Sequence, residues 1–241
     1  MATERSIILT RDAARNRIWA EALTSAGIAC VDLPLIRFEK LPLPQDLDPA
    51  AFDWLLFTSP QGVRAFLESC LTFGAARLGA LGSGTAAALR AAGFAVDFDP
   101  QQKDGAAFAR EFCVQFSPPA AILLPGPDRR MDEPVAILTG AGFTVRELPL
   151  YRTVPVAAAD LPAAPCAPGD VVFFCSPSTV RAFTAAWDER PDAVAIGETT
   201  ARACREAGFP VAVAATPDLR AMVRAAGLDP STLNANLESE P

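Results

Sequence analysis

Short apolar runs alternate with longer amphipathic segments along nearly the whole chain. The apolar runs have the length of buried strands and lie at 6–10, 54–58, 77–81, 95–98, 121–124, 171–175, 193–196 and 211–214. Segments with helical periodicity lie at 15–26, 61–71, 85–92, 106–116, 135–141, 179–187, 199–207 and 219–226. Continuously apolar strands that alternate with helices are typical of parallel sheets covered on both faces. The pattern therefore predicts an α/β fold with doubly wound parallel sheets.

The chain also repeats itself. Gly82 and Gly197 are 115 residues apart, and the decapeptide FTSPQGVRAF at 57–66 matches FCSPSTVRAF at 174–183. Several anchors in the same register indicate two halves of similar structure.

Prolines mark the borders between these halves. They cluster after the two Leu-Pro-Leu motifs at 33–35 and 148–150, whereas the repeat boundary near 117–119 is short. Such stretches are typical of domain boundaries. We therefore expect interleaved domains, one formed by residues 1–38 and 153–241 and the other by residues 39–152. The polar tail after residue 227 is expected to be flexible.

Composition excludes several classes of function. The formal net charge is −7, which disfavours nucleic-acid binding, and there is no histidine, which excludes Ser-His-Asp triads and most zinc sites. No phosphate-binding glycine motif is present. We expect no metal and no organic cofactor.

The cysteines and the N-terminal sequence favour the cytoplasm. The six cysteines have wide spacings without a C-x-x-C pair, and are expected to be buried and reduced: Cys30, Cys70, Cys113, Cys166, Cys175 and Cys204. No signal peptide and no membrane-spanning segment is predicted. We expect a cytoplasmic monomer.

Small hydroxyl residues and glycines follow the predicted strands and precede the predicted helices. In doubly wound folds ligands bind beyond the carboxyl ends of the strands, where helix N-termini attract carboxylates. Each Ser or Thr could equally be an ordinary helix cap. The candidate substrate-binding residues in these loops are Thr58, Ser59, Gly82, Ser83, Thr85, Gly126, Ser176, Ser178, Gly197, Thr199 and Thr200.

Tyr151 is the only tyrosine and follows the second Leu-Pro-Leu motif. Its ring is expected either to face the gap between the domains or to pack on the linker. Arg129, Arg130 and Arg152 could supply positive charge, although exposed arginines are usually only solvated.

The strand-end motifs together resemble those of the uroporphyrinogen-III synthase family. The resemblance covers residues 6–226 and rests on FTSP at 57–60, LGSGTA at 81–86, LYRT at 150–153, FCSPS at 174–178 and IGETTA at 196–201. It implies two flavodoxin-like domains, one of them discontinuous, joined by a two-stranded linker.

The resemblance also implies the reaction. Hydroxymethylbilane, a linear tetrapyrrole polycarboxylate, would lose water in the cleft between the domains and close through a spiro intermediate with ring D inverted. Tyr151 matches the tyrosine that assists departure of the hydroxyl group, and Arg130 matches a later family arginine. Pro125 stands where the family often has arginine, which is a departure from its pattern. Hydroxymethylbilane synthase is the implied donor of the substrate.

Three other functions remain open at this point. A domain of the same fold could bind tetrapyrroles or anions without catalysis. A two-domain binding protein of the periplasmic type is disfavoured by the lack of a signal peptide. A flavodoxin-like electron carrier would be yellow when purified.

Overall fold

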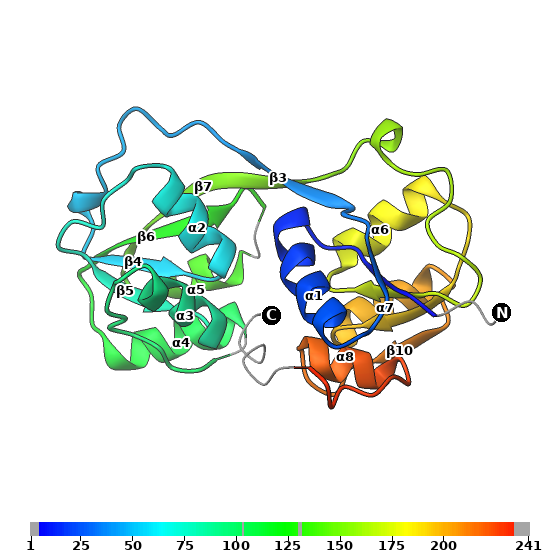
Figure 1. Ribbon diagram of the computed structural model, residues 1–241. Helices are drawn as coiled ribbons and strands as arrows, with labels where there is room; N and C mark the ends of the chain where they lie inside the picture. Colours follow the sequence, from blue (N-terminus) through cyan, green and yellow to red (C-terminus); the bar gives the residue numbers. More distant parts are fainter. Residues whose placement is uncertain (1–4, 103, 130–131, 234–241) are drawn as a thin grey trace. The chain divides into compact units, whose positions relative to one another are not determined.

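A computed structural model describes residues 5–102, 104–129 and 132–233. Contacts divide the chain into two compact units (Figure 1). Unit 1 comprises Met1–Phe38 and Thr153–Pro241, and unit 2 comprises Glu39–Arg152. The chain therefore passes from one unit to the other twice.

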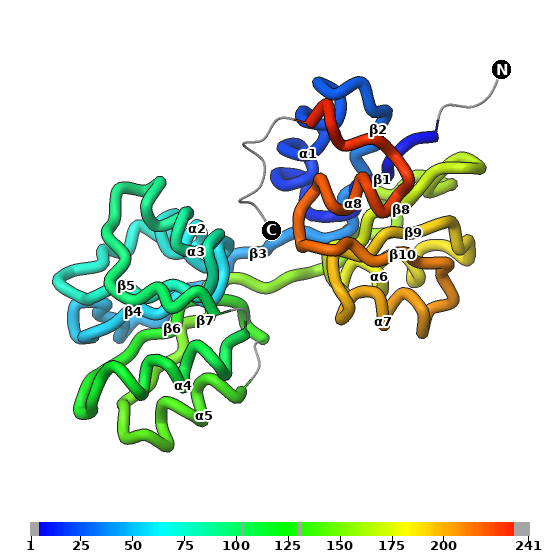
Figure 2. Tube along the Cα trace, turned by 90° about the horizontal axis from the view of Figure 1, so that it is seen from below, coloured from blue at the N-terminus to red at the C-terminus, as the bar shows by residue number. Residues whose placement is uncertain are grey.

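Unit 1 contains a parallel five-stranded sheet in the order β10-β9-β8-β1-β2. Its strands are β1 (Ile7–Leu9), β2 (Cys30–Asp32), β8 (Val171–Phe174), β9 (Asp192–Ala195) and β10 (Val211–Val213). Helices α1 (Ala13–Ser25) and α8 (Leu219–Ala225) pack on one face, and α6 (Pro177–Ala186) and α7 (Glu198–Glu206) pack on the other (Figure 2).

Successive residues of β1 explain this two-sided packing. Ile7 and Leu9 join Trp19 of α1 in one core, whereas Ile8 joins Phe183 of α6 in the other. Because side chains alternate along a strand, an unbroken apolar run fills both layers.

Unit 2 has a second five-stranded sheet in the order β3-β7-β6-β4-β5. Its strands are β3 (Ile36–Lys40), β4 (Trp54–Phe57), β5 (Arg77–Ala80), β6 (Ala121–Pro127) and β7 (Thr144–Pro155). The helices are α2 (Pro60–Glu68), α3 (Ser83–Ala91), α4 (Gly105–Gln115) and α5 (Glu133–Gly140). Figure 2 shows α2 and α3 on one side of this sheet and α4 and α5 on the other.

Aromatic rings fill the layer beneath α4. The Trp54 ring meets the Phe112 ring edge-on at 4.9 Å between centroids, and Phe98 and Phe143 also contact Phe112. Edge-to-face packing of this kind stabilises a core beyond the area that it buries.

The two passages between the units are the strands β3 and β7, which are neighbours in the sheet. The Leu41 N–H donates to the Leu150 carbonyl oxygen at 2.9 Å, and the Val156 N–H donates to the Leu35 carbonyl oxygen at 2.9 Å. The two-stranded linker and the α/β fold with two parallel-rich sheets are thus confirmed.

All eight predicted helices are present with shifted ends, but the predicted strand at 95–98 is wrong. That segment makes only an isolated bridge between Phe98 and Gly79. The Asp97 carboxylate accepts the Leu78 N–H at 2.8 Å. This N–H is therefore not available for the backbone hydrogen bonds of a regular strand pair. The pattern did not predict β2, β3 or β7.

The segment after Gly227 is packed as far as Leu233, although the sequence predicts a flexible tail. Leu233 is buried in the core of unit 1 beside Met222. Arg220 donates to the carbonyl oxygens of Pro230 and Leu233, which fixes the segment against α8. Within the described residues no helix is long and apolar enough to cross a membrane.

Candidate active site at the strand ends

The predicted site residues of unit 2 follow three neighbouring parallel strands. Thr58 and Ser59 follow β4, Gly82 and Ser83 follow β5, and Gly126 lies at the end of β6. Because parallel strands end at the same edge of a sheet, the fold gathers these loops at one edge.

Ser59 has two partners at this edge. Its hydroxyl caps α2 by accepting the Gly62 N–H at 3.0 Å, and it lies 3.3 Å from the hydroxyl of Tyr151. Tyr151 lies on β7 next to Pro127 of β6, and only 5% of its surface is exposed. The sequence predicted both residues separately, and the fold brings their hydroxyl groups together.

Gly62 allows this close arrangement. A Cβ atom at Gly62 would lie 3.3 Å from the Pro125 carbonyl oxygen and 3.7 Å from the Gly126 Cα atom. The first turn of α2 therefore rests directly on the end of β6. Gly126 is buried there, so its backbone shapes the edge next to Ser59 and Tyr151.

Two helices begin at glycine without a side-chain cap. Gly82 precedes α3 with φ +77°, and Gly197 precedes α7 in an extended conformation; neither supplies a cap hydrogen bond. The first N–H groups of such helices carry positive partial charge and can bind carboxylates.

The hydroxyl residues of these two loops differ in exposure. Thr85 and Thr200, three residues after their glycines, are 2% and 4% exposed and face the interior. Ser83 and Thr199 are exposed. A ligand at these helix ends would therefore first meet the backbone N–H groups, Ser83 and Thr199.

The corresponding serine of unit 1 is also a helix cap. The Ser176 hydroxyl accepts the Thr179 N–H at 3.4 Å and lies 2.7 Å from the Ser178 hydroxyl. The capping interpretation is thus correct for both Ser59 and Ser176, and each retains a second hydroxyl contact.

A carboxylate stands at the start of α7. Glu198 is the first residue of this helix and pairs with Arg205 at 2.5 Å. The hydrogen bond from Arg205 lowers the pKa of the Glu198 carboxyl below its ordinary value. Glu198 is therefore charged at neutral pH beside Thr199 and Thr200.

The sequence pattern did not predict the cluster of buried polar residues after β1, which includes Arg11 and Asn16. Asn16 is fully buried, accepts the Arg11 N–H at 2.9 Å and donates to the Leu9 carbonyl oxygen at 2.8 Å. Arg11 is 6% exposed and stacks over Trp19 at 4.8 Å. The only signal of this cluster in the sequence is the pattern Thr-Arg-Asp, which is typical of an ordinary helix cap and does not indicate that Arg11 and Asn16 are buried.

The expected arginines differ in their surroundings. Arg152 pairs with Glu39 at 2.7 Å, and Arg129 is exposed. Arg130 lies outside the described residues.

The cysteines were expected to be buried, and this is wrong for Cys70, which is exposed. Cys204 is buried, and the other four are partly exposed. Burial raises the pKa of the Cys175 and Cys204 thiols to about 11. In the described ranges no group of His, Cys, Asp and Glu side chains is arranged to hold a metal ion.

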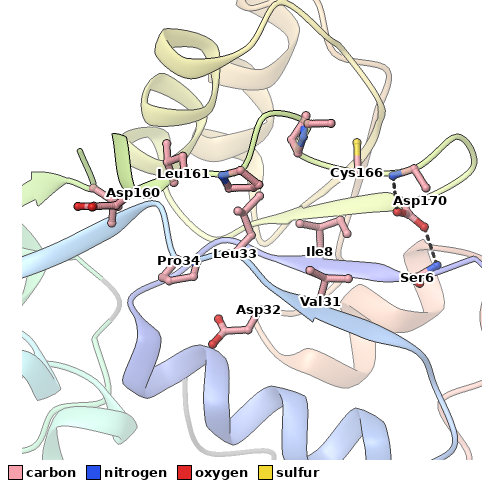
Figure 3. Close-up of a pocket in the computed structure, with 15 residues that line it drawn as sticks. Ser6, Ile8, Val31, Asp32, Leu33, Pro34, Asp160, Leu161, Cys166 and Asp170 are labelled. Atoms are coloured by element: carbon pink, nitrogen blue, oxygen red, sulfur yellow. Dashed lines mark hydrogen bonds between the residues drawn. The ribbon is translucent and has the colours of Figure 1, made fainter. Parts of the chain in front are cut away.

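One cavity lies away from the strand-end hydroxyl groups. It has a volume of about 600 Å³ and separates β1 and β2 from the Pro-rich segment that includes Leu161 and Cys166 (Figure 3). Its lining includes Asp32, Asp160 and Asp170 but no lysine or arginine. Such a cavity does not suit a polycarboxylate.

Comparisons with known proteins give the family. The model of the family "Uroporphyrinogen-III synthase HemD" matches residues 18–224. The chain is 30% identical to a chloroplastic uroporphyrinogen-III synthase of Oryza sativa, over 84% of this chain and 73% of that protein. It is 26% identical to the "Porphyrin biosynthesis protein HemD" of Ruminiclostridium josui, over 90% of this chain but 47% of that protein.

The fold agrees with a solved structure. Uroporphyrinogen-III synthetase from Helicobacter pylori superposes with a TM-score of 0.68 at 22% identity, covering 92% of this chain and 98% of the other. The family match and the fold agree, and the chain belongs to the uroporphyrinogen-III synthase family, the hydro-lyases that form uroporphyrinogen III in tetrapyrrole biosynthesis.

Proposed function

We propose that this chain converts hydroxymethylbilane into uroporphyrinogen III with Tyr151 as the proton donor to the departing hydroxyl group. The contact of Tyr151 with Ser59 at 3.3 Å carries the proposal, since it places a phenol among the strand-end loops. The chain has no histidine that could act instead.

The first step is the loss of water. Tyr151 Oη gives its proton to the hydroxymethyl oxygen, the carbon–oxygen bond breaks, and the electron-rich pyrrole becomes an azafulvene as its nitrogen gives up a proton. That proton restores the phenol directly or through solvent. The pyrrole itself drives this step, so a weak acid that is correctly placed is sufficient.

Ser59 would orient the phenol. A serine hydroxyl has one donor and two acceptor positions. Ser59 already accepts the Gly62 N–H, so it can donate its own hydroxyl hydrogen to Tyr151 Oη and thereby hold the phenol in one orientation.

The inversion of ring D would depend on how the protein positions the two ends of the substrate, and it would need no further acid–base side chain. The substituted α-carbon of ring D attacks the exocyclic carbon of the azafulvene and forms the spiro intermediate. The bond between ring D and the methylene carbon of ring C then breaks and leaves an azafulvene on ring C. The other α-carbon of ring D attacks this methylene carbon and gives up its hydrogen as a proton, which replaces the proton lost from the pyrrole nitrogen in the first step. Holding the two chain ends close together can supply much of the rate.

Backbone N–H groups would hold the carboxylates of the substrate. The first turns of α3 and α7 lack a side-chain cap, and Ser83 and Thr199 are exposed beside them. We propose that these two helix ends, together with the loops at Thr58, Gly126, Ser176 and Ser178, bind the propionate and acetate groups.

The organisation around this reaction is also proposed. Units 1 and 2 would act as its two domains, residues 1–38 with 153–241 and residues 39–152. The protein would act as a cytoplasmic monomer that receives hydroxymethylbilane from its synthase. Sedimentation with and without that synthase tests the monomer and the hand-over.

A coupled assay with freshly made hydroxymethylbilane tests the function. The products are oxidised and the type III and type I isomers are separated by chromatography. We expect type III to dominate with the protein and type I without it. Type I alone in the presence of folded protein would overturn the proposal, and substrate binding without turnover would indicate a non-catalytic binding module.

A further inference from the structure

We propose that the extra residue Leu150 and the backbone N–H of Asp128 together direct the Tyr151 phenol at Ser59, an inference that rests on the proposed function and identifies how the fold aims its proton donor. Asp128 would thus be a positioning residue, which acts through Tyr151 and not on the substrate. All the residues involved belong to unit 2.

The pairing of β6 with β7 shifts by one residue just before Tyr151. Gly126 of β6 pairs with Pro149 of β7. The next residue of β6, Pro127, pairs with Tyr151, so Leu150 is left over as in a β-bulge. Bulges are common beside active sites, where they change the direction of a side chain.

The burial of the side chains shows the effect of this shift. Leu148 and Leu150 are buried, and Pro149 between them is exposed. Side chains alternate along a regular strand, so the residue after Leu150 would lie on the exposed side with Pro149. Tyr151 is instead buried, and its hydroxyl reaches that of Ser59. The extra residue therefore turns Tyr151 away from the exposed side of β7 and toward the strand-end loop.

Prolines favour the bulge at this point. A proline lacks the N–H that a strand ladder needs, and inside a sheet it is tolerated mainly at bulges. Both β6 and β7 have neighbours on each side in the sheet, and Pro127 and Pro149 lie at the shifted position. A regular pairing of the two strands is therefore disfavoured here.

Two backbone hydrogen bonds fix the bulge from opposite sides. The Leu41 N–H, after β3, donates to the Leu150 carbonyl oxygen at 2.9 Å. The Asp128 N–H, after β6, donates to the Tyr151 carbonyl oxygen at 2.8 Å. Because Pro127 has no N–H, Asp128 is the first residue after the shift that can donate to β7. Its N–H therefore sets where Tyr151 stands along β6.

The Ser59 hydroxyl is held against the same strand. Ser59 accepts the Gly62 N–H, and a Cβ atom at Gly62 would lie 3.3 Å from the Pro125 carbonyl oxygen. The start of α2 thus rests on β6 before the shift, whereas Tyr151 is fixed to β6 after it. The distance between the two hydroxyl groups consequently depends on the bulge.

Proline and alanine at Asp128 form a matched pair that tests the N–H. The Asp128 side chain is exposed. Asp128→Pro removes the backbone donor, and Asp128→Ala keeps it. We expect Asp128→Pro to lower kcat for the type III product about tenfold or more with KM changed less than about threefold, because a misplaced phenol affects the transition state and not the binding of the carboxylates. Asp128→Ala should match the wild type.

A spectroscopic measurement separates positioning from general damage. Tyr151 is the only tyrosine, so protein produced with fluorotyrosine gives a single fluorine NMR signal. Ser59→Ala should shift this signal in the wild-type and Asp128→Ala backgrounds, since the hydroxyl contact is lost. It should hardly shift the signal in the Asp128→Pro background, where the two hydroxyl groups are already apart.

A second anchor repeats the test if Asp128→Pro does not fold, as judged by circular dichroism. Leu41→Pro removes the donor to the Leu150 carbonyl oxygen, and Leu41→Ala keeps it. We expect Leu41→Pro to lower kcat more than Leu41→Ala and to weaken the response of the fluorine signal to Ser59→Ala.

The outcomes are distinguishable. A folded Asp128→Pro variant with wild-type kcat would overturn the proposal. An equal fall of kcat in Asp128→Pro and Asp128→Ala, or a fall with an unchanged response of the fluorine signal, would also overturn it. A wild type without type III product would contradict the proposed function, whereas the fluorine signal would still decide whether the Asp128 N–H positions Tyr151.

Discussion

The hydroxyl oxygens of Tyr151 and Ser59 lie 3.3 Å apart, although the two residues are 92 positions apart in the chain. Ser59 is the N-cap of α2, and Tyr151 lies on the strand that passes from unit 2 back to unit 1. The Ser59 hydroxyl group thus both caps α2 and contacts the hydroxyl group of the candidate acid, Tyr151. This pairing makes the orientation of Tyr151 dependent on how α2 begins.

Replacement of Ser59 tests this dependence. Ser59→Ala removes the cap of α2 and the partner of Tyr151, so we expect a loss of about 1 kcal/mol of unfolding free energy and a fall in kcat of about tenfold. Chemical denaturation and the coupled assay measure the two effects.

Asp104→Ala is the control for the loss of a cap alone. Asp104 caps α4 by accepting the Ala107 N–H at 2.8 Å and is exposed. It should lose similar stability and keep its kcat. An equal fall of kcat in both variants would mean that capping, not orientation, explains the effect of Ser59.

The Ser59 and Tyr151 effects should not be additive. If Ser59 acts only through the phenol, Ser59→Ala should lower kcat much less in a Tyr151→Phe background than in the wild type. The four kcat values of the double-mutant cycle measure this coupling. Independent, additive effects would contradict a positioning role for Ser59.

Removal of the charge on Glu198 should strengthen the binding of the substrate. Glu198 is negative at the start of α7, where a carboxylate of the substrate is proposed to bind. Glu198→Gln removes like-charge repulsion, and KM should fall roughly twofold to fivefold at low salt, with little change at high salt. The ion pair with Arg205 is exposed and screened by solvent, so the stability of the protein should hardly change. A KM that rises would contradict a carboxylate site at this helix end.

The buried thiol of Cys204 predicts a loss of stability in alkali. Its pKa is raised from 9.0 to about 11 by burial, so the unfolded chain loses the proton first as the pH rises. The stability that the buried, neutral thiol contributes is fully present below pH 9 and is lost between about pH 9 and pH 11. It should amount to something on the order of 1 kcal/mol.

Denaturation at pH 8 and pH 10.5 measures this contribution. Cys204→Ala should lower stability at both values through the cavity that it leaves, but with a smaller difference between them than in the wild type. Cys70→Ala at an exposed position should keep the wild-type difference. An unchanged pH dependence in Cys204→Ala would show that this thiol is not responsible.

The helices and the buried strands could be predicted from the sequence because their patterns are local. Runs such as Trp54–Phe57 are buried on both faces and read as continuous apolar stretches. The long strand Thr144–Pro155 escaped prediction because it contains prolines and mostly exposed or half-exposed residues. Its pairing with β3 depends on the second passage of the chain, which no local pattern encodes.

The residues of the candidate site also divide into those that a local pattern predicts and those that depend on contacts between distant segments. The loops at Ser59 and Ser176 could be identified because a serine before a proline-led helix is a local signal. The contact of Ser59 with Tyr151 could not be identified, because it depends on the register between β6 and β7. The burial of Arg11 also escaped prediction, since Trp19 and Asn16 cover it only after α1 has folded back on β1.

The coupled assay of the Tyr151→Phe variant tests the central role of Tyr151 most directly. This variant keeps the ring and loses only the hydroxyl group, so it should fold as the wild type and bind uroporphyrin III with an almost unchanged dissociation constant. Its kcat for formation of the type III isomer should fall about 10²-fold, the lower range for loss of a general acid. Wild-type kcat with wild-type isomer ratio in the folded variant would contradict the account.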